Sequence, residues 1–112
     1  MVSVYAERIR TIKQNIGLSI EDLARAVGTT SRTMARWASG ANAPRGITRQ
    51  RLLELATVSQ QLAKVMTPEA SAAWLLQPNA LLGHMRPIDL VAQGRYRDVL
   101  DLIDAVGDGV FV

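Results

Sequence analysis

The sequence predicts an all-α protein built from two small helical domains. Apolar residues make up 48% of the 112 positions, and aromatic residues only 4%. The apolar residues recur three and four positions apart, which is the period of an amphipathic helix, and runs of β-branched residues are scarce. Serine, threonine, glycine and proline stand where such helices would begin and end. We therefore expect a core of Leu, Ile, Val and Ala packed between short helices.

Composition also excludes several classes of protein. The absence of cysteine excludes disulfides and cysteine-ligated metal, and we expect neither a metal nor a cofactor. No apolar run approaches the ~20 residues that a membrane span needs. The first ten residues also lack the apolar segment of a signal peptide. The simplest expectation is a cytoplasmic protein with no membrane partner.

The first helix is predicted to begin after Ser3 and to end at Gly17. A serine is a favourable N-cap, and a glycine accepts the left-handed backbone that commonly ends a helix. The apolar stripe between them consists of Tyr5, Ile9, Ile12 and Ile16.

The next stretch, IEDLARAVGTTSRTMARW, has the pattern of two short helices joined by a tight turn. Ser19 can cap the first helix, Gly28 can end it, and Thr30 can cap the second. At 100° per residue, Arg32 and Arg36 lie opposite the apolar face of the second helix. The inward residues of the two helices are Ile20, Leu23, Ala24, Val27, Met34, Trp37 and Ala38.

This pattern resembles the helix-turn-helix of the Xre and Cro-type repressors. The resemblance is carried by the small Ala24, the turn Gly28 and the apolar Met34 and Trp37, at the spacings that two closely crossing helices need. It implies that the second helix enters the DNA major groove. The DNA-reading candidates on that helix are Ser31, Arg32, Thr33 and Arg36, with the two arginines contacting bases directly.

The loop after this motif adds positive charge. Its sequence, SGANAPRGIT, places Arg45 at the tip, with Arg49 and Arg51 just beyond. In such folds this loop lies beside the recognition helix, so the three arginines are candidate phosphate contacts, which raise affinity without selecting a sequence. A longer helix is then predicted from Thr48 to about Met66.

Charge divides the chain near residue 66. Residues 1–66 carry ten Lys or Arg against four Asp or Glu, a net +6, whereas residues 67–112 carry three against six, a net −3. The sum recovers the formal net charge of +3. We therefore predict a DNA-binding domain at 1–66 and a protein-binding domain at 67–112, because phosphate attracts the first and repels the second.

The second domain is predicted to contain four short helices. Thr67 caps a helix that opens at Pro68 and ends at Pro78. Gly83 breaks a short turn, and Pro87 opens the next helix. The last helix lies between the glycines at 94 and 107, with the stripe Tyr96, Val99, Leu100, Ile103 and Val106.

This half resembles the toxin-binding domain of the Xre/MbcA/ParS antitoxins. The resemblance is carried by Trp74-Leu75, Pro78-Asn79, Leu82-Gly83, Arg86-Pro87 and Asp89-Leu90, followed by Gly94 and a final helix. A helix-turn-helix domain followed directly by this one is the architecture of that family. The resemblance implies an antitoxin that binds a RES-domain, NAD-degrading toxin and occludes its active site with the C-terminal region. It also implies repression of its own operon through operator DNA.

The C-terminal tip is the first candidate for toxin binding. Its residues, Gly109, Val110, Phe111 and Val112, are mostly apolar and would be poorly solvated if they stood alone. We hypothesise that the tip plugs the toxin. The alternative is that it folds back onto Trp74 and Leu100.

Charged residues of the second domain supply the other toxin-binding candidates. Asp98, Asp101 and Asp104 recur every three residues along the last helix, and carboxylates so spaced rarely converge on one metal ion. They form either a solvated face or a docking ridge for a basic rim, and we take Asp101 and Asp104 as candidate contacts. Arg86 is a further candidate, although pairing with Asp89 to fix a helix start is the role that we favour.

No catalytic set emerges, because the only histidine, His84, has no cysteine or second histidine beside it, and we expect no enzyme. The first alternative is a plain helix-turn-helix repressor whose second domain only dimerises or senses a ligand. The second is an interaction protein that no longer binds DNA, since Thr29 and Glu21 depart from the repressor pattern. DNA binding would need a homodimer, or a hetero-oligomer with toxin, and Trp74 and Leu75 are candidates for that contact.

Overall fold

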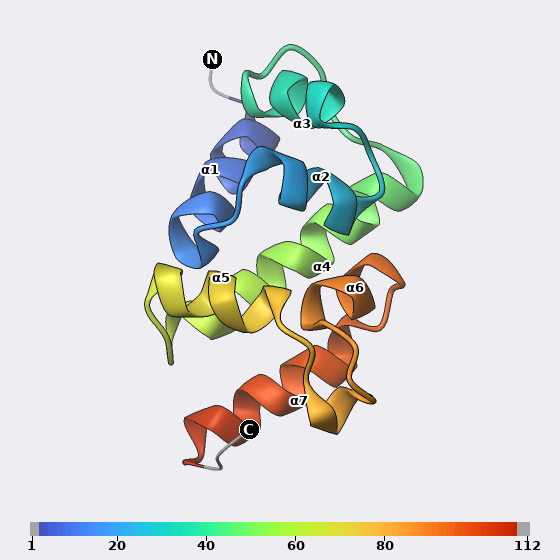
Figure 1. Ribbon diagram of the computed structural model, residues 1–112. Coiled ribbons are helices and arrows are strands. Elements are labelled where there is room, and N and C mark those ends of the chain that lie inside the picture. The colour runs from blue at the N-terminus through green and yellow to red at the C-terminus, as the bar shows by residue number, and fades with distance from the viewer. Residues whose placement is uncertain (1–2, 110–112) are drawn as a thin grey trace.

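The computed structural model describes residues 3–109, and this part of the chain is all-helical (Figure 1). Seven α-helices and one short 3-10 helix, η1, follow one another within it. Their bounds are α1 Val4–Ile16, α2 Ile20–Val27, α3 Ser31–Ala38, α4 Gly46–Ala63, α5 Pro68–Leu76, η1 Ala80–Leu82, α6 Pro87–Ala92 and α7 Tyr96–Gly107. The all-α prediction is confirmed. None of these helices is long and apolar enough to cross a lipid bilayer.

Local capping sets where several helices begin and end. Each predicted cap oxygen accepts a hydrogen bond from the backbone N–H three residues ahead, at 3.1 to 3.4 Å. Gly17 and Gly28 end α1 and α2 with φ angles of 60° and 87°, which glycine adopts without a side-chain clash. The caps confirmed in this way are Ser3, Ser19, Thr30 and Thr67.

The α4 helix departs from its predicted range by two or three residues at each end. It begins earlier, after Arg45, whose backbone is extended and whose carbonyl accepts a 2.8 Å hydrogen bond from Thr48 Oγ1. It ends earlier, at Ala63, because the N–H groups of residues 64 and 65 turn back to the carbonyls of residues 61 and 62. Such tightened bonds are a common way for a helix to stop.

The helices of the second half begin and end near the predicted proline and glycine residues. α5 begins at Pro68 and ends before Pro78, η1 ends at Gly83, and α6 begins at Pro87. The four predicted segments are therefore present, one of them as a 3-10 helix. His84 lies in the turn after η1 and is the one non-glycine residue with a positive φ, 65°, among residues 3–109.

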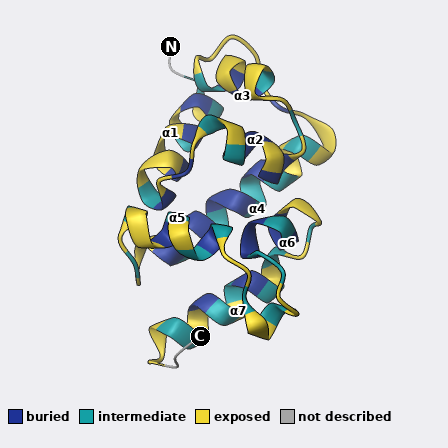
Figure 2. Ribbon diagram, in the orientation of Figure 1, coloured by how far each residue is buried: buried dark blue, intermediate teal, exposed yellow. Residues whose placement is uncertain are grey.

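The central helix, α4, packs against helices from both halves of the chain (Figure 1). Leu55, Val58 and Leu62 of this helix have no exposed surface, and Figure 2 shows the buried band that runs through α4 and α5. One cluster of buried side chains extends from Ile9 in α1 to Ile103 in α7. The helices of the two predicted domains therefore share a core that crosses residue 66.

Gly17 allows α5 to approach the end of α1 closely. A β-carbon built at this position would lie 2.9 Å from the carbonyl oxygen of Pro68, the first residue of α5. Real β-carbons do not approach a backbone oxygen so closely. The glycine therefore serves two purposes: it ends α1, and it lets the two halves of the chain meet.

Candidate DNA interface and partner-binding surfaces

The predicted DNA-reading helix, α3, lies at one end of the molecule (Figure 1). Its apolar face is buried against the core, and Figure 2 shows that the rest of the helix is largely exposed. Ser31, Arg32 and Arg36 are exposed, whereas Thr33 is half-buried and its Oγ1 lies 3.1 Å from that of Thr30. Among residues 3–109 no carboxylate pairs with Arg32 or Arg36. Both guanidinium groups are therefore available to a ligand.

Arg45 and Arg49 add positive charge at the start of α4. Both side chains are exposed, and neither forms an ion pair within the described part of the chain. The first turn of α4 has no acidic residue and no side-chain cap, so its N–H groups add to the local positive potential. The two predicted phosphate contacts thus lie in an environment that suits an anion.

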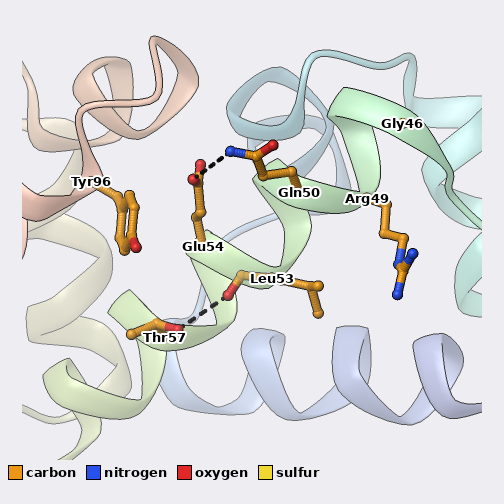
Figure 3. Close-up of a pocket in the computed structure, with 7 residues that line it drawn as sticks. All are labelled: Gly46, Arg49, Gln50, Leu53, Glu54, Thr57 and Tyr96. Carbon is orange, nitrogen blue, oxygen red and sulfur yellow. Dashed lines mark hydrogen bonds between the residues drawn. The ribbon is translucent and has the colours of Figure 1, made fainter.

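A groove between α4 and the start of α7 connects this basic region with the second half of the chain (Figure 3). Its lining residues are Gly46, Arg49, Gln50, Leu53, Glu54, Thr57 and Tyr96. Gln50 donates a 3.2 Å hydrogen bond to Glu54, and Thr57 donates one of 3.2 Å to the Leu53 carbonyl. Figure 3 shows Arg49 at the opposite end of the groove from Tyr96. The guanidinium of Arg49 therefore remains accessible.

Arg51 differs from its two neighbours because its side chain faces inward. Its Nη1 lies 3.0 Å from Glu54 Oε1, and the two side chains are only 18% and 12% exposed. Its guanidinium also covers Gly94, where a β-carbon would lie 2.7 Å from Nη2. The expectation that Arg51 contacts phosphate is therefore corrected, since its charge is already engaged inside the protein.

The acidic residues of α7 lie toward the opposite end of the molecule from α3 (Figure 1). Asp98 pairs with Arg95 at 2.8 Å. Asp101 and Asp104 are exposed and have no basic partner among residues 3–109. No group of three or more histidine or acidic side chains in that range is placed to hold a metal ion. Asp101 and Asp104 are therefore negative charges available to a basic partner.

Arg86 forms the predicted pair with Asp89. Its Nε and Nη2 donate hydrogen bonds of 2.8 and 2.9 Å to the two carboxylate oxygens, and this interaction raises the pKa of Arg86. A small cavity beside the pair is also lined by Asp22 and Arg25 of α2. The pair therefore fixes α6 where it packs against the helix-turn-helix, and a role for Arg86 in toxin binding remains a prediction.

Two predictions concern the tip and a dimer contact. Gly109 is exposed just beyond α7, whereas Val110, Phe111 and Val112 lie outside the described residues, so insertion of the tip and its fold-back both remain hypotheses.

Leu75 has no exposed surface, which makes it a core residue. Trp74 is half-buried and packs against the same core.

One further surface is not predicted by the sequence pattern. η1 and α7 border an open groove, which we term the η1–α7 groove. Its apolar residues are Leu81, Leu82, Met85 and Leu102, and its charged residues are Arg95, Asp98 and Asp101. Leu81 is 63% exposed. The only sequence signal was an Ala-Leu-Leu triplet between turn residues, which indicates a turn but does not show what its side chains face.

Comparison with known proteins gives consistent matches over this chain. Residues 57–109 match the antitoxin Xre/MbcA/ParS C-terminal toxin-binding domain. The chain is 40% identical over 111 residues to the mycobacterial cidal antitoxin MbcA of Mycobacterium tuberculosis, covering 99% of this chain and 98% of that protein. It is 30% identical over 110 residues to a probable mycobacterial cidal antitoxin of the same organism, covering 98% and 94% of the two chains.

The fold is also found in a solved structure. The protein is similar to a chain in the crystal structure of the M. tuberculosis MbcT-MbcA toxin-antitoxin complex, with a TM-score of 0.88 and 40% identity. The match covers 99% of this chain and 100% of that chain, so it includes the helix-turn-helix as well as α5 to α7. On these grounds the protein belongs to the Xre/MbcA/ParS family of antitoxins.

Proposed function

We propose that this antitoxin neutralises a RES-domain, NAD-degrading toxin by binding it directly and occluding its active site, and that it represses its own operon. The observation that carries the proposal is the similarity to MbcA over 99% of the chain, because it includes both the helix-turn-helix and the toxin-binding part. The likeness to a chain from a toxin-antitoxin complex supports a toxin as the partner. The proposed activity is binding, which requires no catalytic group.

The arrangement of charge supports two different partners. The exposed arginines of α3 and of the α4 start lie in the half with net charge +6, and the exposed aspartates of α7 lie in the half with net charge −3. α3 and α7 are at opposite ends of a molecule whose longest dimension is 42 Å (Figure 1). DNA and toxin can therefore be held at the same time without competing for one surface.

The proposed DNA contacts divide into two kinds. Arg32 and Arg36 are placed to reach base edges if α3 enters the major groove, and Ser31 and Thr33 to assist at its edge. Arg45 and Arg49 are placed to contact phosphate, which strengthens binding to every sequence alike. Because one such module offers few contacts, we propose that a homodimer, or an assembly with toxin, binds two half-sites about one DNA turn apart.

The proposal implies a RES-domain protein encoded by a neighbouring gene, here called the cognate toxin, and co-expression with it tests the proposal. We expect the toxin alone to deplete NAD, and co-expression to give a stable complex, measured by native mass spectrometry, with NAD preserved. A mobility-shift assay with the upstream DNA tests repression. Binding to that DNA without any toxin complex would instead favour a plain repressor whose second half only dimerises or senses a ligand.

Replacing the proposed DNA-contacting arginines should produce two distinguishable defects. Arg36→Ala is expected to lower discrimination between operator and unrelated DNA by about 1 to 3 kcal/mol, because a bidentate arginine-guanine contact is lost. Arg49→Ala is expected to weaken both DNAs equally and to reduce the salt dependence of binding. Titrations at several salt concentrations measure both quantities.

The matched control for these substitutions is Arg97→Ala, which removes an exposed arginine from α7, away from α3. It should change operator binding little, because only long-range charge is altered. Identical behaviour of Arg36→Ala and Arg49→Ala would refute the division between base and phosphate contacts.

A further inference from the structure

The η1–α7 groove is bordered by a loop that holds an apolar side chain toward solvent. Asn79 Oδ1 accepts a 2.9 Å hydrogen bond from the Leu81 N–H, and the Asn79 N–H donates one of 3.0 Å to the Met85 carbonyl. The carbonyl of Asn79 also accepts a 2.9 Å bond from the His84 N–H. The loop is therefore closed on itself, yet Leu81 stays 63% exposed.

Backbone strain marks the same loop. Gly83 adopts a φ of 65° without strain, whereas His84 has the same φ and, as a non-glycine residue, adopts it at a modest energetic cost. Strain of this kind persists where the surrounding structure enforces a particular shape, and it is frequent at binding surfaces. It accompanies the turn that follows the exposed leucine.

The groove lies wholly within the part of the chain that matches the toxin-binding domain, residues 57–109. The groove between α4 and α7 differs in this respect, because most of its lining residues precede residue 57 (Figure 3). Of these two grooves, the η1–α7 groove is therefore the one positioned to meet a toxin.

The charges at the rim indicate what a partner must carry. Asp98 is already paired with Arg95 at 2.8 Å, whereas Asp101 has no basic partner among residues 3–109. Asp104, one helical turn further along α7, is likewise unpaired in that range. A partner that fits this groove would place an apolar side chain against its leucines and a positively charged side chain against Asp101.

We propose that the η1–α7 groove is a docking site for the cognate toxin, which places an aliphatic or aromatic side chain against Leu81 and a lysine or arginine against Asp101. This inference rests on the proposed function and adds a second point of attachment to it. The groove holds the toxin, whereas active-site occlusion belongs to the proposed function itself. Affinity and inhibition then depend on different residues.

Full-length variants and purified cognate toxin test the groove by isothermal titration calorimetry. Leu81→Ser is expected to raise the dissociation constant by about tenfold or more, since a buried apolar contact is lost. Its matched control is Ile47→Ser, at a residue 58% exposed on α4, which should bind as the wild type does. Leu81→Met, which keeps an apolar side chain of similar volume, should restore most of the affinity.

The contribution of the Asp101 charge is tested in the same calorimetric titration. Asp101→Asn is expected to raise the dissociation constant about two- to fivefold and to reduce its salt dependence. The control, Glu69→Gln, removes an exposed acid from the first turn of α5 and should leave the salt dependence unchanged.

Two negative outcomes are distinguishable. If the wild type binds toxin and Leu81→Ser binds it as tightly as Ile47→Ser does, the groove assignment is overturned and the proposed function stands. If the wild type itself fails to bind the cognate toxin, the proposed function is overturned and the groove assignment with it. Circular dichroism establishes that each variant is folded before it is titrated.

Discussion

A protein that lacks residues 108–112 is expected to bind the cognate toxin and yet leave it able to consume NAD. The proposed occlusion belongs to the tip after α7, whereas the η1–α7 groove and Asp101 precede Gly107 and are retained. The deletion removes the three apolar side chains that are proposed to fill the active site and none of the groove residues. NAD consumption by purified toxin, measured with saturating wild-type or shortened antitoxin, checks the prediction.

Two full-length variants test whether the loss of inhibition comes from the tip itself. Phe111→Ser, at full length, should inhibit incompletely, because it removes only the aromatic ring of the tip. Ile47→Ser keeps the tip and alters an exposed apolar residue elsewhere, so it should inhibit fully. Complete inhibition by the shortened protein would show that the tip is not what closes the active site.

Gly17→Ala is expected to lower the free energy of unfolding by about 2 to 4 kcal/mol, the sum of a strained left-handed backbone and a forced steric overlap. The overlap arises because the new β-carbon would lie 2.9 Å from the Pro68 carbonyl oxygen. That oxygen is backbone at the start of α5, so α1 and α5 must separate to make room. Urea unfolding followed by circular dichroism measures the loss.

Gly28→Ala is the matched control for this substitution. Gly28 also has a positive φ, 87°, but no atom lies within 4 Å of the position that its β-carbon would take. This variant should lose only the backbone contribution, about 1 to 2 kcal/mol. Equal destabilisation of the two variants would mean that the contact between α1 and α5 contributes nothing measurable.

Much of the local structure could be predicted from the sequence because helix ends are set by short-range chemistry. Ser19 and Thr30 cap the two helices of the helix-turn-helix, and Gly28 separates them, as the residue types indicate. The pairing of Arg86 with Asp89 is also local, three residues apart on one helix start, and was predictable for that reason.

Features that depend on distant segments could not be predicted. The spacing of Gly17 indicates a helix end, but nothing near it in sequence indicates that Pro68 will pack there. Arg51 and Arg49 are the same residue type and lie two positions apart in the sequence, so local pattern cannot tell them apart. Only the tertiary fold brings Gly94 beneath the side chain of Arg51. The η1–α7 groove likewise exists only because a turn and a later helix come together.

α4 packs against both halves of the molecule, so the two halves are expected to unfold, and to be degraded in the cell, at the same rate. α4 completes the core for α1 to α3 and also for α5 to α7. It cannot unfold in one half while the other stays folded, so the chain should unfold cooperatively. On the proposed function, a protease that captures the unfolded chain would release promoter and toxin in a single event. The rate of degradation would then set the delay before both become active.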